Sequence, residues 1–127
     1  MPSTLRIRSI RGFIGAKDFS ESRKFYQTLG FEEVVIDAKM SLFKVNDQMG
    51  FYLQNAYVKN WINNSMLFLE VVDLEAWEKH LLSLNLIALF PTVKMTEISV
   101  FPYGREIFLH DPAGVLWHFC QFYEGES

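Results

Sequence analysis

Apolar and polar residues alternate, or recur with a helical period, along most of the first half of the chain. Residues 5–16 begin with partial alternation and end in the apolar run 13–16, which predicts a strand whose end is buried. A helix is expected to begin at Asp18, because Asp18 and Glu21 can form a capping box, and to end at Gly30. Short strands are expected after it at residues 32–36, 41–45 and 49–54.

The second half repeats this order after a connecting segment at residues 55–64. A buried strand is expected at residues 66–72, and Asp73 is placed to cap a helix whose apolar residues recur at steps of three and four. Residues 13–19 align with residues 68–74 without a gap. Further strands are expected at residues 86–93, 105–110 and 115–122, with a turn at 111–114.

This repeat predicts an α+β fold built from two βαβββ modules, about residues 5–54 and 65–123, within a single domain over residues 1–127. Neither half can bury its sheet alone, so the halves must pair, either within one chain or by exchange across a dimer. The expected result is a curved mixed sheet around a cleft, with the helices on its outer face. A cleft lined from both modules is the natural site for a ligand.

Composition narrows the possible partners. The chain has 127 residues and a formal net charge of −3, and its lysines and arginines form no cluster that would bind a nucleic acid backbone. Its apolar runs are too short for a membrane span. A lone cysteine, Cys120, and the absence of a secretory signal favour the reducing cytoplasm. Aromatic residues make up 16% of the chain, so some rings are expected to line a cavity or an interface.

Two stretches resemble the signatures of the vicinal oxygen chelate superfamily. Residues 18–31 read DFSESRKFYQTLGF, and residues 104–118 read GREIFLHDPAGVLWH. The first is similar to the superfamily's opening helix, and the second to its closing hairpin with an Asp-Pro-x-Gly turn. The resemblance implies the fold of glyoxalase I, bleomycin-resistance proteins, fosfomycin-resistance enzymes and extradiol dioxygenases, usually assembled as a homodimer.

In that superfamily, a metal is held by His, Glu or Gln side chains at four strand positions. Carried over by the resemblance, these positions fall on Arg11, Tyr52 (or Gln54), Met66 (or Asn64 or Leu67) and His118. Only His118 is a competent ligand, whereas a catalytic site needs about three protein ligands. We therefore expect no metal and no cofactor.

The ligand-binding residues that we expect are His118, Arg11, Tyr52, Tyr103, Phe13 and Arg105. Each has an alternative role. His118 could face the cleft or be an interior histidine, and Arg11 could neutralise an anionic ligand or form a surface ion pair. Because Arg105 and Glu106 are adjacent in a strand, only one of them can face the cleft. Tyr103 belongs to a segment, 100–104, that could be a lid or a dimer contact.

The favoured function is metal-independent binding of a small aromatic or anionic molecule, in the manner of the bleomycin-resistance proteins, by a homodimer. One alternative is a metal-dependent lyase, isomerase or dioxygenase that uses His118 as a ligand. Another is a non-catalytic dimeric interaction domain whose aromatic residues are all core and interface. The superfamily contains lyases, transferases and dioxygenases, so the resemblance alone leaves open whether this chain is an enzyme.

Overall fold

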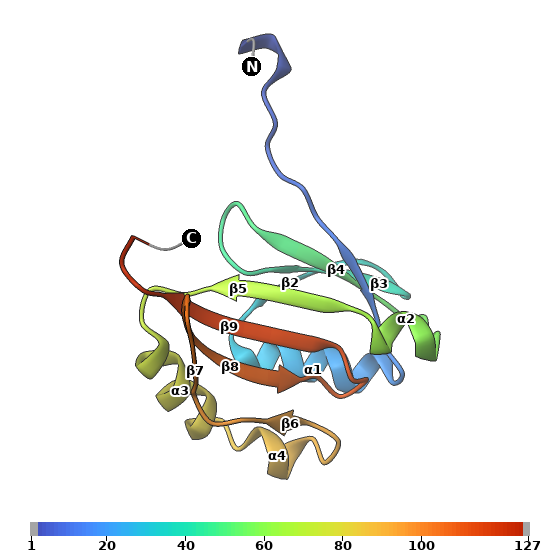
Figure 1. The fold of residues 1–127 in the computed structure, drawn as a ribbon. Coiled ribbons are helices and arrows are strands. Elements are labelled where there is room, and N and C mark those ends of the chain that lie inside the picture. The colour runs from blue at the N-terminus through green and yellow to red at the C-terminus, as the bar shows by residue number, and fades with distance from the viewer. Residues whose placement is uncertain (1–2, 126–127) are drawn as a thin grey trace.

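A computed structural model of the chain describes residues 3–125 (Figure 1). After a short 3-10 turn at Ser3–Leu5, the first module consists of β1 (Phe13–Gly15), α1 (Phe19–Leu29), β2 (Glu32–Asp37), β3 (Met40–Lys44) and β4 (Gly50–Gln54). A short helix, α2 (Lys59–Asn63), leads to the second module. That module consists of β5 (Met66–Glu70), α3 (Leu74–Ser83), α4 (Leu86–Leu89), β6 (Lys94–Met95), β7 (Ser99–Phe101), β8 (Gly104–His110) and β9 (Leu116–Phe122).

Each module forms a sheet of its own. The first sheet has the order β1-β4-β3-β2 and the second has the order β5-β9-β8-β6, with β7 also pairing with β8. In both sheets the first strand of the module runs parallel to its last strand, and the other pairs are antiparallel. The predicted α+β fold with two repeated modules is confirmed. Between residues 3 and 125, no helix is long and apolar enough to cross a bilayer.

The two main helices begin where the sequence predicts. The side chain of Asp18 accepts a hydrogen bond from the backbone N–H of Glu21 (3.1 Å), and Asp73 accepts one from Ala76 (3.0 Å). Gly30 ends α1 with φ at 109°, a left-handed conformation that glycine adopts without steric cost. The two halves therefore use the same N-terminal capping device at aligned positions.

Three strand predictions are wrong in detail. The strand expected from residue 5 is confined to β1, because residues 6–10 extend away from both sheets (Figure 1). The side chains of these residues are exposed. The strand expected at 86–93 is instead the short helix α4 and a turn, and it follows a left-handed Asn85 (φ 53°). The strand expected to be buried at 66–72 is half-exposed, since Met66 and Phe68 point away from the core. Short apolar runs do not distinguish these cases.

One hydrophobic core joins the inner faces of both sheets, with Tyr26 of α1 inside it. The Tyr26 hydroxyl donates a hydrogen bond to Oδ2 of Asp111 (2.6 Å) and accepts one from Nε1 of Trp117 (2.9 Å). The other Asp111 oxygen, Oδ1, accepts the backbone N–H groups of residues 113, 114 and 115. Burial raises the pKa of Asp111, although all four hydrogen bonds favour its ionised form. The first module is thus fastened to the Asp-Pro turn of the second.

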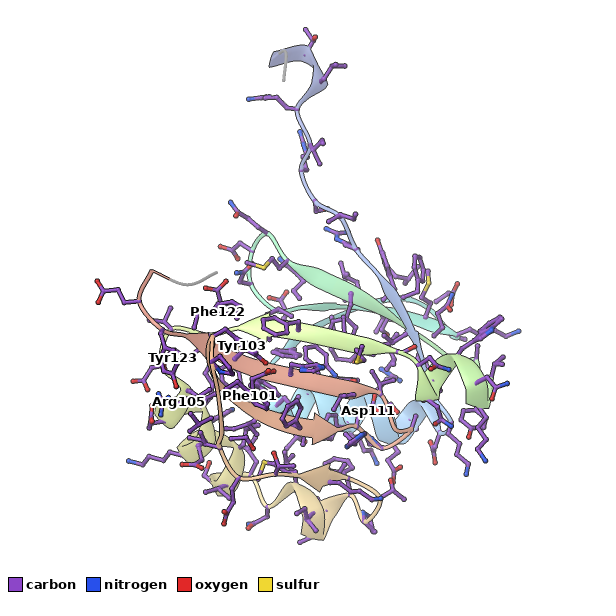
Figure 2. All side chains as sticks on the ribbon, in the orientation of Figure 1. Phe101, Tyr103, Arg105, Asp111, Phe122 and Tyr123 are labelled. Carbon is purple, nitrogen blue, oxygen red and sulfur yellow. The ribbon has the colours of Figure 1, made fainter. Side chains whose placement is uncertain are left out.

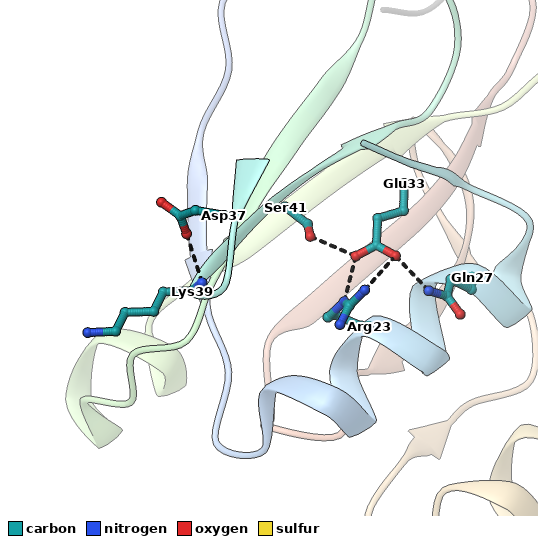
Figure 3. A network of polar contacts seen from close by, with 6 residues as sticks. All are labelled: Arg23, Gln27, Glu33, Asp37, Lys39 and Ser41. Atoms are coloured by element: carbon teal, nitrogen blue, oxygen red, sulfur yellow. Dashed lines mark hydrogen bonds and ion pairs between the residues drawn. The ribbon is translucent and has the colours of Figure 1, made fainter. Parts of the chain in front are cut away.

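A second polar network fastens α1 to its own sheet (Figure 3). Glu33 of β2 accepts a bidentate pair of hydrogen bonds from Arg23 (2.6 and 3.2 Å), one from Gln27 (2.7 Å) and one from Ser41 of β3 (2.6 Å). Burial raises the pKa of Glu33, but these hydrogen bonds outweigh burial and leave the pKa below its usual value.

Candidate functional site

The face of the second sheet that points away from the core carries a polar centre in an aromatic frame. Strand register places Phe68, His118 and Phe108 side by side on β5, β9 and β8. Glu70, Cys120 and Glu106 form the next row on the same face. We call this surface the module-two face; it also includes Phe101 and Tyr103 from β7 and its turn, and Phe122 from β9.

Glu106 is the centre of the polar group, and its side chain is 2% exposed. Its Oε1 lies 2.8 Å from Nδ1 of His118, and its Oε2 accepts a hydrogen bond from the hydroxyl of Tyr103. The hydrogen bond to Glu106 is the main cause that raises the pKa of Tyr103 to about 12, so the phenol keeps its proton and acts as the donor. Both carboxylate oxygens therefore have partners.

Aromatic rings surround this group. Phe68 stacks on the His118 ring at 5.6 Å between centroids, and Phe108 meets the same ring edge-on at 5.1 Å. Phe101, Tyr103 and Phe122 continue the frame around Glu106 (Figure 2). Phe68 is 52% exposed, which leaves one wall of the frame open to solvent.

Cys120 lies under this face and is fully buried. Burial raises the pKa of its thiol, and the carboxylates of Glu106 and Glu70 raise it further. A thiol in this environment stays protonated and is a poor nucleophile. Cys120 is therefore an apolar wall residue, as the sequence predicts.

The corresponding face of the first sheet, the module-one face, carries a smaller group. Phe13 of β1 stacks on Tyr52 of β4 at 4.7 Å between centroids. Arg11 donates a hydrogen bond to the Tyr52 hydroxyl (3.1 Å), and its guanidinium lies 5.8 Å from the centre of that ring. In the described part of the chain Arg11 forms no ion pair. The structure therefore does not show the surface ion pair that was the alternative role for Arg11.

Arg105 lies on the opposite side of its strand from Glu106. It forms a bidentate ion pair with Glu75 of α3 and lies 3.5 Å from Oε1 of Gln121. The pair with Glu75 raises the pKa of Arg105 and lowers that of Glu75. Of these two neighbours, Glu106 is therefore the one that joins His118, and Arg105 helps to fasten α3 to the second sheet.

Five of the six predicted residues thus fall into two groups, one for each module, and Arg105 belongs to neither. Arg11, Phe13 and Tyr52 lie together, and so do Tyr103 and His118. Across residues 3–125, no hydrogen bond or ring contact joins the two groups, and no strand of one sheet pairs with a strand of the other. The two groups therefore lie on separate sheets of a single chain.

A cavity of about 810 Å³ lies beside the module-two face. Phe68 and Phe122 belong both to that face and to the cavity wall, which continues to Trp77 of α3 and to Met49 in the turn between β3 and β4. The cavity is large enough for a drug-sized molecule. It extends the aromatic frame toward the first module.

The sequence left open whether Arg105 or Glu106 faces the site, and sequence reasoning missed Phe68 as a member of it. The alignment of residues 13–19 with 68–74 contains the signal for Phe68, because it places Phe68 over the predicted site residue Phe13. The identification of Glu106 requires the register of the β8–β9 hairpin, in which Glu106 lies opposite Cys120. That register depends on the turn at 111–114, whose geometry the sequence alone leaves open.

No family model matches the sequence, and no curated protein is significantly similar to it. Solved structures do resemble the fold. A bleomycin-binding protein from bleomycin-producing Streptomyces verticillus, solved with copper(II)-bleomycin, is 21% identical with a TM-score of 0.74, over 94% of this chain and 99% of that one. Lactoylglutathione lyase from Agrobacterium tumefaciens is 17% identical with a TM-score of 0.68, over 89% and 92%.

A glyoxylase/bleomycin resistance protein/dioxygenase domain from Frankia sp. EAN1pec is 14% identical with a TM-score of 0.70, over 95% of this chain and 96% of that one. The chain has the fold of these bleomycin-binding and glyoxalase-like proteins, as the resemblance in the sequence predicts. At these identities the comparison establishes the fold, and the chemistry must be argued from the residues.

A metal is often associated with this fold, but the donors present here do not suit one. The positions that correspond to metal ligands carry the guanidinium of Arg11, the thioether of Met66 and the phenol of Tyr52, in addition to His118. Among residues 3–125, no three His, Cys, Asp or Glu side chains are grouped to hold an ion, whereas a catalytic zinc site has about three protein ligands.

Proposed function

We propose that the protein binds a small, flat aromatic or anionic molecule between these two faces, without a bound metal. The observation that carries this proposal is the open aromatic frame around Glu106 and His118, in which Phe68 is half-exposed. The bleomycin-binding protein of similar fold supports a small-molecule ligand. Arg11 on the module-one face supplies a cation for an anionic group of the ligand.

We further propose that the protein is a homodimer in which the module-one face of one copy meets the module-two face of the other. Leu5, Ile7 and Ile10 on the N-terminal arm (residues 4–12) are 60%, 70% and 94% exposed, and Phe13 and Met66 on the two faces are also more than half exposed. Apolar side chains in this number on a small protein mark an interaction surface. Two equivalent contacts of this kind would close a symmetric dimer.

Charge supports the same arrangement. The arm carries three arginines, at positions 6, 8 and 11, whereas the module-two face carries the exposed Glu70 above the buried Glu106. Opposite charges on surfaces that meet favour association and fix its register. The cytoplasmic location remains a prediction from the sequence.

Binding can be tested with 8-anilinonaphthalene-1-sulfonate, a probe that is both aromatic and anionic. We expect Phe68→Ala to weaken its affinity about twofold to tenfold, as the loss of one aromatic contact implies. Leu82→Ala is the matched control, because Leu82 is also more than half exposed (61%, against 52% for Phe68) but lies on α3. Equal weakening by both variants, measured by fluorescence titration, would reject the module-two face as the site.

Dimerisation can be tested separately by light scattering after size-exclusion chromatography. The double variant Ile7→Glu/Ile10→Glu is expected to be monomeric, since it places charge where the arm would be covered. Leu82→Glu adds one carboxylate on α3 and is expected to leave the dimer intact. A wild-type protein that is monomeric at micromolar concentration would refute the assembly.

A further inference from the structure

A smaller cavity, of about 280 Å³, lies at the Asp-Pro turn, at the opposite end of the β8–β9 hairpin from Tyr103 and Phe122 (Figure 2). We call it the turn cavity. Its wall brings together the β1–α1 turn, the segment before α2, the start of β6 and the end of β8, through Lys17, Tyr57, Lys94 and His110. It shares no lining residue with the module-one face or the module-two face, so it is a separate place in the fold.

The side chains around the turn cavity are basic. Lys17 comes from the first module and Lys94 from the second, and neither forms an ion pair within residues 3–125. The register of β6 with β8 places Lys94 opposite His110, so the imidazole lies beside the second ammonium group. Among the described residues, no aspartate or glutamate lines the cavity, although the chain as a whole has a net charge of −3. Two lysines without a neighbouring carboxylate attract an anion.

The carboxylates that are adjacent in the sequence already have other partners. Asp111 follows His110, but it is fully buried, and its oxygens accept hydrogen bonds from Tyr26 and from three backbone amides of the turn. Asp18 follows Lys17, and its Oδ1 accepts the backbone N–H that caps α1. Neither aspartate forms an ion pair with a lysine of the cavity, so an anion from solution can take that place.

Contacts within the wall hold these groups in place. The Lys17 ammonium lies 5.7 Å from the centre of the Tyr57 ring, a distance at which the ring attracts the cation. The hydroxyl of Thr92, two residues before Lys94, donates a hydrogen bond to the backbone carbonyl of Pro112 (2.8 Å). This bond ties the segment that leads into β6 to the Asp-Pro turn. A site whose groups are positioned before the ligand arrives loses less entropy when the ligand binds.

We propose that the turn cavity binds a phosphate group, either as the free ion or as a monoester, between Lys17 and Lys94. Lysine ammonium groups bind phosphate as point charges, and two of them match a group that carries nearly two negative charges at neutral pH. The cavity volume of about 280 Å³ is smaller than that of sites for drug-sized molecules, so it suits a phosphate group with a small body against the Tyr57 ring. This site is distinct from the one proposed for the two faces.

Isothermal titration calorimetry with inorganic phosphate at low ionic strength tests the proposal. The wild-type protein should bind one phosphate per chain, and Lys17→Met/Lys94→Met should weaken the affinity by about tenfold or more. Lys24→Met/Lys79→Met is the matched control, because it removes two exposed lysines of α1 and α3 and changes the net charge equally. All four lysines are exposed, so both variants are expected to fold. Equal weakening by the two variants, or no saturable binding to the wild type, would overturn the proposal.

Phenyl phosphate and benzoate identify the anion. If the cavity takes monoesters, phenyl phosphate should bind about threefold to tenfold more tightly than inorganic phosphate, because its ring packs on Tyr57; equal affinities would identify the free ion as the ligand. Benzoate has the same ring and a single charge, and should bind about tenfold more weakly than phenyl phosphate. Benzoate that binds as tightly as phenyl phosphate would overturn the assignment to phosphate. Phe68→Ala should leave these affinities unchanged, which separates this site from the one proposed for the two faces.

Discussion

The two modules present the same geometric motif with opposite electrostatic character. Each places a phenylalanine of its first strand on a polar ring of its last strand, Phe13 on Tyr52 and Phe68 on His118. In the first module the polar ring is hydrogen-bonded to an exposed cation, Arg11. In the second module it is hydrogen-bonded to a buried anion, Glu106. A repeat can thus preserve packing while its two copies diverge in charge.

Removing the polar partner of the ring in each module should give the largest difference in stability between the two modules. Glu106→Ala leaves Tyr103 and His118 without their common acceptor in a buried site, and should lower the free energy of unfolding by about 3 kcal/mol or more. Arg11→Ala removes an exposed contact and should change it by about 0.5 kcal/mol at most. Urea denaturation measures both values. Equal losses would contradict the contrast in burial.

The N-terminal caps of α1 and α3 should contribute equally to the stability of the protein. Asp18→Ala and Asp73→Ala each remove one acceptor for an N-terminal amide, and each is expected to cost about 1 kcal/mol of stability. Serine at either position should recover most of the loss, because its hydroxyl can accept the same hydrogen bond. A cost at one position alone, by denaturation, would break the equivalence of the repeat.

A double-mutant cycle tests whether the two faces form one site. If they meet across a dimer, Phe13→Ala and Phe68→Ala should show a coupling of about 0.5 kcal/mol or more in the affinity for 8-anilinonaphthalene-1-sulfonate. Effects that add within about 0.3 kcal/mol would mean that the probe contacts only one face. Phe68→Ala paired with Leu82→Ala is the control cycle and should be additive.

Glu33 belongs to the first module only. Of the substitutions considered, its replacement should change the stability at neutral pH the least. Its pKa is lowered on folding, so it stabilises the folded state above the unfolded value of 4.5, and that contribution is lost as the pH falls through the folded value. Glu33→Gln should therefore make stability less steeply dependent on pH below 4.5, with a change of a few tenths of a kcal/mol at pH 7. Thermal unfolding from pH 3 to 7 measures this; an unchanged slope would contradict it.

The sequence predicted the repeated elements well because they depend on local chemistry. Asp18 and Asp73 cap their helices through neighbouring amides, and Gly30 ends α1 through its own backbone freedom. The segment 86–93 was misassigned because an apolar run of that length fits a buried strand or a short helix equally well. Its outcome depends on packing against the rest of the second module.

Only the part of the candidate site that depends on local patterns could be predicted. Arg11, Tyr52, Tyr103 and His118 could be named from the resemblance and from alternation. The partner of His118 could not, because Glu106 is joined to it by the pairing of β8 with β9. Hydrogen bonds between strands depend on register, and a slip of one residue would have turned Glu106 to the other side of the sheet.

The sequence by itself determined the two modules, their helix caps and the supply of aromatic side chains, since periodicity and capping act over a few residues. The tertiary structure alone decided that Glu106 rather than Arg105 joins His118, that Phe68 is exposed, and that the two polar groups lie on separate faces of one chain. These features depend on the contacts between residues distant in the sequence, and no local pattern encodes them.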